Sequence, residues 1–155
     1  MLKSLILVTI FGLAAGPLLA VAQPGSRETA AAIAALKAIR NSIPAGKPVI
    51  VAKEASNRNL KIARSVGWPL LHPRAALKCP ASIDLSECVV PPGRVALDIV
   101  TIVVDDTTAR VDITVLSPAD PREVGQKLSY ELWSVHLSYS DGSWCIKRIL
   151  PPAIS

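Results

Sequence analysis

The chain has 155 residues, of which 17 are Lys or Arg and 12 are Asp or Glu, so its formal net charge is +5. This length allows one domain with a hydrophobic core and is too short for two such domains. Aromatic residues make up only 4% of the chain and the basic residues are dispersed, so the composition argues against nucleic acid as a partner.

Residues 1–22 have the features of a secretory signal peptide. A lysine precedes an uncharged apolar run, and an Ala-Val-Ala site ends at Ala22, directly before Gln23. The alternative is an uncleaved membrane anchor, because the run approaches the ~18 apolar residues that a spanning helix needs. Pro17 near the end of the run favours cleavage. We therefore expect a secreted or periplasmic protein whose mature part, residues 23–155, forms a single domain.

A helix is predicted over residues 26–41, with Ser26 as its N-cap and Glu28 in its first turn. A second helix is predicted over part of residues 48–66, where Gly67 is placed to end it. The run VIVA at the start of this span could by itself form a strand.

Residues 68–93 contain five prolines and no sustained period, so they predict an ordered Pro-rich loop. Cys79 and Cys88 lie within this loop, and a disulfide between them would restrict an otherwise floppy segment. Cys145 is then left over, since three cysteines form at most one internal disulfide. Pairing of Cys145 with either of the others stays open, because connectivity cannot be deduced from sequence.

After the Pro-rich loop, the sequence predicts four consecutive antiparallel strands. They cover residues 94–104, 109–117, 127–140 and 143–150, and an Asp141-Gly142 turn joins the last two. Four strands after an α-rich first half predict an α+β protein whose helices lie on one face of the sheet.

Side chains alternate across a strand, so residues 127–140 present two different faces. The more apolar face is expected to meet the helices, and it contains Glu131, Trp133, Val135 and Leu137. The outer face contains Tyr130, Leu132 and His136, a mixture of apolar and polar side chains. Such a half-apolar outer face is a candidate partner surface, and a homodimer is its simplest use.

The end of the chain carries the specific part of a family resemblance. N-terminal helices, a hairpin and a long strand are followed by an Asp-Gly turn into Trp-x-Ile at residues 141–146. In this order of elements, residues 26–42 and 94–150 resemble the nuclear transport factor 2-like superfamily. The resemblance implies a cystatin-like roll, in which N-terminal helices pack on a curved four-stranded antiparallel sheet around a cone-shaped cavity. The Pro-rich segment with its cysteines departs from the family's pattern.

Members of that superfamily include isomerases and dehydratases as well as non-catalytic binding modules, so the resemblance alone assigns no reaction. An enzyme of this kind would need an acid or base with a raised pKa in its cavity. Glu131 on the inner face and Asp98 within an apolar run are the candidate carboxylates. A non-catalytic module would instead hold a small apolar ligand against Trp133, Val135 and Leu137.

No metal site or cofactor is predicted. His72 and His136 are the only histidines, and no group of His, Cys or Asp has the spacing of metal ligands. The sequence contains no glycine-rich phosphate loop and no Gly-x-Ser-x-Gly motif. Lys147 could activate the Cys145 thiol, although a buried or disulfide-bonded thiol is the preferred interpretation.

Charge is distributed unevenly along the mature chain. Residues 23–78 hold 10 Lys and Arg against 2 Asp and Glu, whereas residues 79–155 hold 6 against 10. The simplest interpretation is a basic helical layer beside a more acidic sheet, and the alternative is contact with an anionic partner or membrane surface. We expect a non-catalytic binding or accessory module. A small-molecule isomerase or dehydratase and an envelope-surface protein that binds anionic groups are the two alternatives.

Overall fold

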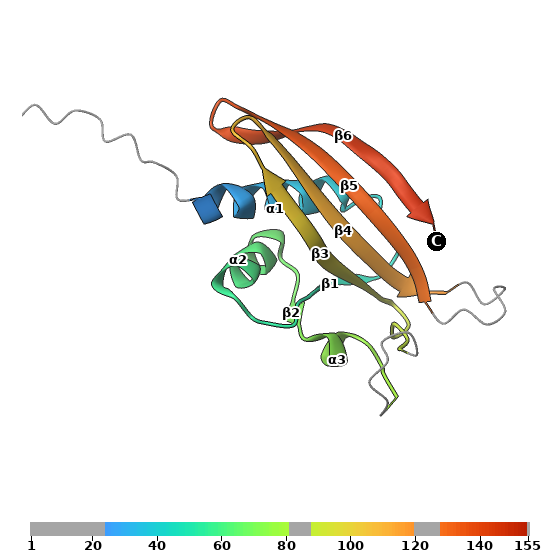
Figure 1. Cartoon of the computed structure of the whole chain (residues 1–155). Coiled ribbons are helices and arrows are strands. Elements are labelled where there is room, and N and C mark those ends of the chain that lie inside the picture. Colours follow the sequence, from blue (N-terminus) through green and yellow to red (C-terminus); the bar gives the residue numbers. More distant parts are fainter. Residues whose placement is uncertain (1–23, 81–87, 120–127, 155) are drawn as a thin grey trace, which may run out of the picture.

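The structure is a computed structural model that describes residues 24–80, 88–119 and 128–154 (Figure 1). Its elements in chain order are α1 (Pro24–Ile39), β1 (Lys47–Val51), α2 (Asn57–Val66), β2 (Leu70–Leu71), α3 (Pro73–Ala76), β3 (Arg94–Val104), β4 (Thr108–Pro118), β5 (Leu128–Ser140) and β6 (Ser143–Ile154). The predicted signal peptide at residues 1–22 lies outside the described residues.

The strands form one six-stranded mixed sheet in the order β2-β1-β3-β4-β5-β6. β1 runs parallel to both of its neighbours, and all pairings from β3 to β6 are antiparallel. The protein is α+β, but the predicted four-stranded antiparallel sheet is wrong, because β1 and β2 add a parallel edge. The strand β1 also separates α1 from α2, so the first half is not a continuous group of helices.

The physical reason for this error lies in the short apolar run of β1. Val49, Ile50 and Val51 are all buried, as expected for a parallel strand that is covered on both faces. A continuous apolar run of this length does not distinguish a buried strand from a helix. Its strand state depends on β3, which pairs with β1 along its whole length.

Both predicted helices form, with shifted bounds. α1 begins at Pro24, which suits a first helical turn, so Ser26 lies inside that turn and its predicted capping role is wrong. α2 is capped instead by Ser56, whose side chain accepts a hydrogen bond from the Asn59 backbone N–H at 3.2 Å. Gly67 ends α2 in the left-handed conformation at φ 73°, which confirms the predicted stop.

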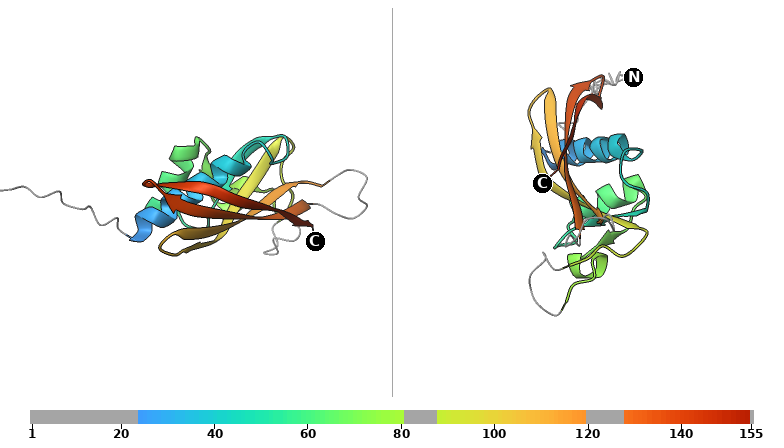
Figure 2. Two further views of the ribbon diagram at one scale, coloured as in Figure 1. Left: turned by 90° about the horizontal axis from the view of Figure 1, so that it is seen from above. Right: turned by 90° about the vertical axis from the view of Figure 1, so that its right-hand side faces the viewer.

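α1 and α2 pack against the same face of the sheet, and the sheet curves around α1 (Figure 2). Alternate residues of the strands point into this layer, including Val111, Ile113 and Val115 of β4. The fully buried side chains of this core include Leu36, Ile39, Ile62, Val95, Leu97, Val111, Ile113 and Val135.

A second hydrophobic cluster covers the opposite face at the β1–β3 end of the sheet. It consists of Val49, Val51, Ala76, Leu77, Cys88, Val90 and Ala96. The predicted disulfide Cys79–Cys88 is confirmed. Two backbone hydrogen bonds between Lys78 and Val89, at 2.9 and 2.8 Å, flank it. Part of the Pro-rich segment therefore forms ordered structure that packs on the sheet.

The β5–β6 hairpin closes through the predicted Asp-Gly turn. Asp141 and Gly142 have φ angles of 51° and 78°, which is the left-handed conformation that tight hairpin turns require at both central residues. Cys145 follows on β6, where it is exposed and free of a disulfide, so the expectation of a buried or bonded thiol is wrong.

Candidate functional site

The residues predicted on the inner face of the long strand lie in the core. Val135 and Leu137 are fully buried, and Trp133 is 9% exposed. The Trp133 indole N–H donates a hydrogen bond to Glu131 Oε2 at 3.0 Å, so this carboxylate is tied to its own strand. None of these side chains lines either of the two grooves described below.

Asp98 lies on the other face of the sheet from Glu131. Its register partner on β4 is Thr114, whereas the partner of Glu131 is Val115, and neighbouring residues of a strand point to opposite faces. Desolvation raises the pKa of Asp98 above its ordinary value of 3.8, although the residue as a whole is exposed. Lys53 has a weaker, opposite effect on this pKa. The structure does not bring the two candidate carboxylates together.

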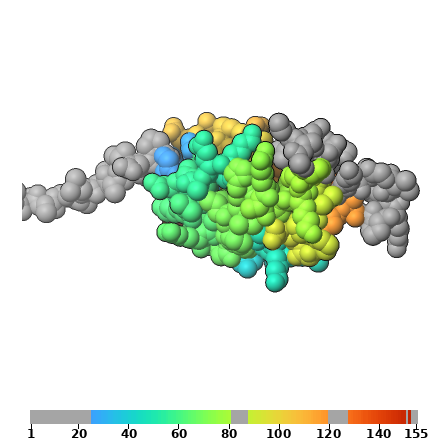
Figure 3. Space-filling model, turned by 90° about the horizontal axis from the view of Figure 1, so that it is seen from below, coloured from blue at the N-terminus to red at the C-terminus, as the bar shows by residue number. Residues whose placement is uncertain are grey.

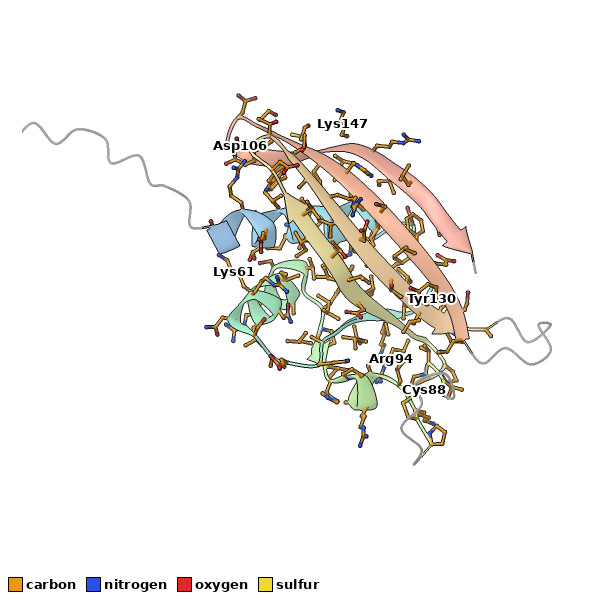
Figure 4. The ribbon with its side chains drawn as sticks, viewed as in Figure 1. Lys61, Cys88, Arg94, Asp106, Tyr130 and Lys147 are labelled. Carbon is orange, nitrogen blue, oxygen red and sulfur yellow. A yellow bond between two sulfur atoms is a disulfide. The ribbon has the colours of Figure 1, made fainter. Side chains whose placement is uncertain are left out.

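The predicted partner surface, Tyr130, Leu132 and His136, lies on the face of the sheet opposite α1, because the register partners of these residues on β4 alternate with residues of the core that α1 covers. Figure 4 labels Tyr130 on β5. Tyr130 is 42% exposed, and its hydroxyl accepts a hydrogen bond from Thr114 Oγ1 at 3.3 Å. Polar groups nearby are also paired, because Asp112 accepts a hydrogen bond from Ser134 and forms an ion pair with Arg110. These residues form an open surface of mixed polarity.

The structure also contains a groove of about 780 Å³, which we call the basic groove. It lies between residues 40–49, residues 67–71 and Arg94. Arg40, Lys47 and Arg94 are its charged lining residues, and no acidic residue among residues 24–80, 88–119 and 128–154 lines it. Figure 3 shows the side of the molecule that the segment from β1 to α3 largely forms. This segment supplies the lining residues within 47–49 and 67–71.

The local fold explains why this groove exists. β2 pairs only with Ile50 and Val51, so the first half of β1 has β3 on one side and no strand on the other. Gly46, just before β1, lies so close to β3 that an added Cβ would approach Val95 Cγ2 to 2.9 Å. The approach of the chain at Gly46 and the late start of β2, at Leu70, leave the edge of β1 open.

Two cations of the basic groove lie side by side on neighbouring strands. Lys47 of β1 and Arg94 of β3 are register partners, and like charges in such positions destabilise a sheet. Arg94 is held in place because its Nη1 donates hydrogen bonds to the carbonyl oxygens of Ala75 and Ala76 at 3.1 and 3.0 Å. The ion pairs within the described ranges, Arg58–Glu28 and Arg110–Asp112, include none of the groove's cations.

Trp68 joins the basic groove to the core. It is 5% exposed, and the Arg40 guanidinium lies 5.9 Å from its ring centroid. Its indole N–H is buried and has no hydrogen-bond partner in the part of the chain that the structure describes. Leaving such a donor unpaired costs about 1–3 kcal/mol. An acceptor atom supplied from outside the chain would remove this cost.

A smaller groove of about 400 Å³ separates α1 from the β5–β6 turn. The guanidinium of Arg27 lies 4.5 Å from the Tyr139 ring centroid and 5.4 Å from that of Trp144. Arg27 also donates to the Asp106 carbonyl oxygen, and its own carbonyl accepts from Trp144 Nε1 at 3.1 Å. These contacts fasten the start of α1 to two hairpins, so we assign this cluster a structural role.

The sequence indicated a basic first half but not the basic groove. Arg40, Lys47 and Arg94 come from the end of a helix, the start of β1 and the start of β3, so no local spacing relates them. The one available signal was the surplus of cations over residues 23–78.

No group of three or more His, Cys, Asp or Glu side chains that could hold a metal ion occurs within residues 24–80, 88–119 and 128–154. His72 instead caps α3, where its Nδ1 accepts a hydrogen bond from the Arg74 backbone N–H at 3.3 Å. None of the described helices has the length and apolar character needed to cross a membrane.

Comparisons of the chain with protein-family models, curated proteins and solved structures found no match. The resemblance to the nuclear transport factor 2-like superfamily therefore stays a prediction.

Proposed function

We propose that this chain is a secreted or periplasmic, non-catalytic binding protein that holds an anionic ligand in its basic groove. The observation that carries the proposal is the convergence of Arg40, Lys47 and Arg94 in a groove that no acidic side chain of the described residues lines. The adjacent Lys47 and Arg94 weaken the sheet in the absence of an anion. A bound carboxylate or phosphate would neutralise this repulsion and accept charge-assisted hydrogen bonds.

The compartment is part of the proposal. The Cys79–Cys88 disulfide is compatible with an oxidising environment such as the periplasm or the extracellular space. The features of residues 1–22 support export, with cleavage between Ala22 and Gln23.

An isomerase or dehydratase has less support. Glu131 and Asp98 lie on opposite faces of the sheet, and neither lines the basic groove. A homodimer through Tyr130, Leu132 and His136 and a small apolar ligand on the inner face both stay predictions.

The test is equilibrium dialysis of the full chain with radiolabelled inorganic phosphate. The double variant R40Q/K47Q should bind phosphate at least about tenfold more weakly, because each charge-assisted hydrogen bond contributes roughly 1.5–3 kcal/mol and 1.4 kcal/mol is a factor of ten. The matched control is R64Q/K61Q, which removes the same two residue types from the exposed side of α2. Its phosphate affinity should stay within twofold of the wild type.

Equal losses in the two double variants would contradict the proposal, because they would show attraction to the net charge and not to the groove. Absence of phosphate binding by the wild type at low ionic strength would also contradict it, since screening is weakest there.

A further inference from the structure

The basic groove is much larger than a simple inorganic anion requires. Its volume of about 780 Å³ is in the range of pockets that hold drug-sized molecules, roughly 300–1,000 Å³. A phosphate or carboxylate group alone would leave most of this space to water. The rest of the groove therefore indicates what is attached to the anion.

The other lining side chains are mostly apolar. Ile43 and Leu71 are half-buried, and Val49 and Trp68 are buried beside them. Ile43 and Trp68 belong to the core beneath α1, and Val49 and Leu71 belong to the second hydrophobic cluster. The wall of the groove therefore continues both clusters. An apolar chain placed here would remove hydrophobic surface from water.

The walls are also restricted in their conformation. Pro44, Pro48 and Pro69 line the groove, and proline fixes its own φ angle. Arg94 is anchored by its two carbonyl partners on α3. A site with few groups left to order on binding loses little conformational entropy.

We propose that the ligand is a single-chain amphiphilic anion, with a carboxylate or phosphate head and an apolar tail. This inference rests on the proposed function and adds the class of ligand. The head lies with Arg40, Lys47 and Arg94, and the tail lies against Ile43 and Leu71. Such a molecule matches both the charge of the groove and its apolar wall.

Three probes test this with the wild-type chain alone: octyl phosphate below its critical micelle concentration, inorganic phosphate and octanol. Octyl phosphate should bind at least about tenfold more tightly than inorganic phosphate, because burial of even two methylene groups accounts for that factor. It should also bind at least about tenfold more tightly than octanol, which lacks the anion. Isothermal titration calorimetry measures all three.

Two variants locate the parts of the ligand. L71S should weaken binding of octyl phosphate about threefold or more and leave inorganic phosphate unchanged, whereas R40Q/K47Q should weaken both phosphates. The matched control is L60S on α2, a half-buried leucine outside the groove. Circular dichroism checks that L71S folds, and I43S replaces this variant if it does not fold. The comparison of the three probes uses the wild-type chain and does not depend on either variant.

The outcomes separate the two proposals. Equal affinity for octyl phosphate and inorganic phosphate would overturn the amphiphile and leave the anion site intact. Equal affinity for octyl phosphate and octanol would overturn both. Binding to phosphatidylglycerol vesicles without binding to monomeric octyl phosphate would overturn the amphiphile in favour of a membrane surface.

Discussion

Asp98 shows how one side chain can weaken the folded state. Packing around β3 desolvates its carboxyl group and raises the pKa of Asp98, while Lys53 opposes this effect. An acid whose pKa is raised by folding binds its proton more tightly in the folded chain than in the unfolded chain. Stability is therefore lost as the pH rises from the ordinary value of 3.8 through the raised pKa.

The variant D98N should remove this loss. Its Tm should exceed that of the wild type at neutral pH and equal it at about pH 2.5, where the carboxyl group is protonated in both states. Differential scanning calorimetry across this range measures the difference. The contrasting variant D112N lies on the same face but loses an ion pair with Arg110 and offers Ser134 a neutral amide oxygen in place of a charged acceptor, so its Tm should fall at neutral pH. A lower Tm for D98N at neutral pH would contradict the assigned cause.

At the scale of the element, α2 illustrates how local signals define a helix. Ser56 satisfies the Asn59 N–H at its start, and Gly67 donates its backbone N–H to the carbonyl oxygens of Ala63 and Arg64 at its end. Between them, Ile62, Ala63 and Val66 provide the buried face. The helix supports the basic groove, because its C-cap Gly67 and the next residue, Trp68, both line the groove.

The variant S56A should lower the free energy of unfolding by about 0.5–2 kcal/mol, because the capping hydrogen bond is lost. Ser65 supplies the matched control within the same helix, since its hydroxyl bonds only the Lys61 carbonyl oxygen of the preceding turn. S65A should be neutral or slightly stabilising, because alanine has the higher helix propensity. Urea unfolding curves measure both, and equal losses would show that the cap has no special role.

At the scale of the whole molecule, α3 and the described residues on either side of the disulfide complete the second face of the sheet. Cys88 is fully buried in the cluster that also contains Ala76 and Ala96. α3, which precedes Cys79, carries the carbonyl oxygens of Ala75 and Ala76 that hold Arg94, so it connects the stability of the fold with the geometry of the basic groove.

The double variant C79S/C88S should lose about 2–3 kcal/mol of stability, the value that chain entropy predicts for closing a short ring. C145S is the control and should unfold like the wild type, because Cys145 is exposed and free. Titration of the native chain with a thiol reagent should find one reactive thiol, and titration after reduction and unfolding should find three. Two or three reactive thiols in the native, unreduced chain would contradict the pairing.

The sequence by itself determined those features that depend on residues close to one another along the chain. The Asp141-Gly142 turn, the helix stop at Gly67 and the alternation of the antiparallel strands are confirmed because each follows from local backbone preferences. The sequence favoured the Cys79–Cys88 pairing but left Cys145 as an alternative partner, and the structure decided for the ring of sequence separation 9.

Only the tertiary structure decided the parallel edge of the sheet and the basic groove. β1 is a strand because β3 lies beside it, and a parallel pairing joins segments that no turn signal connects. Lys47 and Arg94 become neighbours through that pairing, and Arg40 reaches the same groove from the end of α1. Composition revealed the surplus of positive charge, but the distance between these charges depends on contacts that are remote in sequence, and local preferences do not encode them.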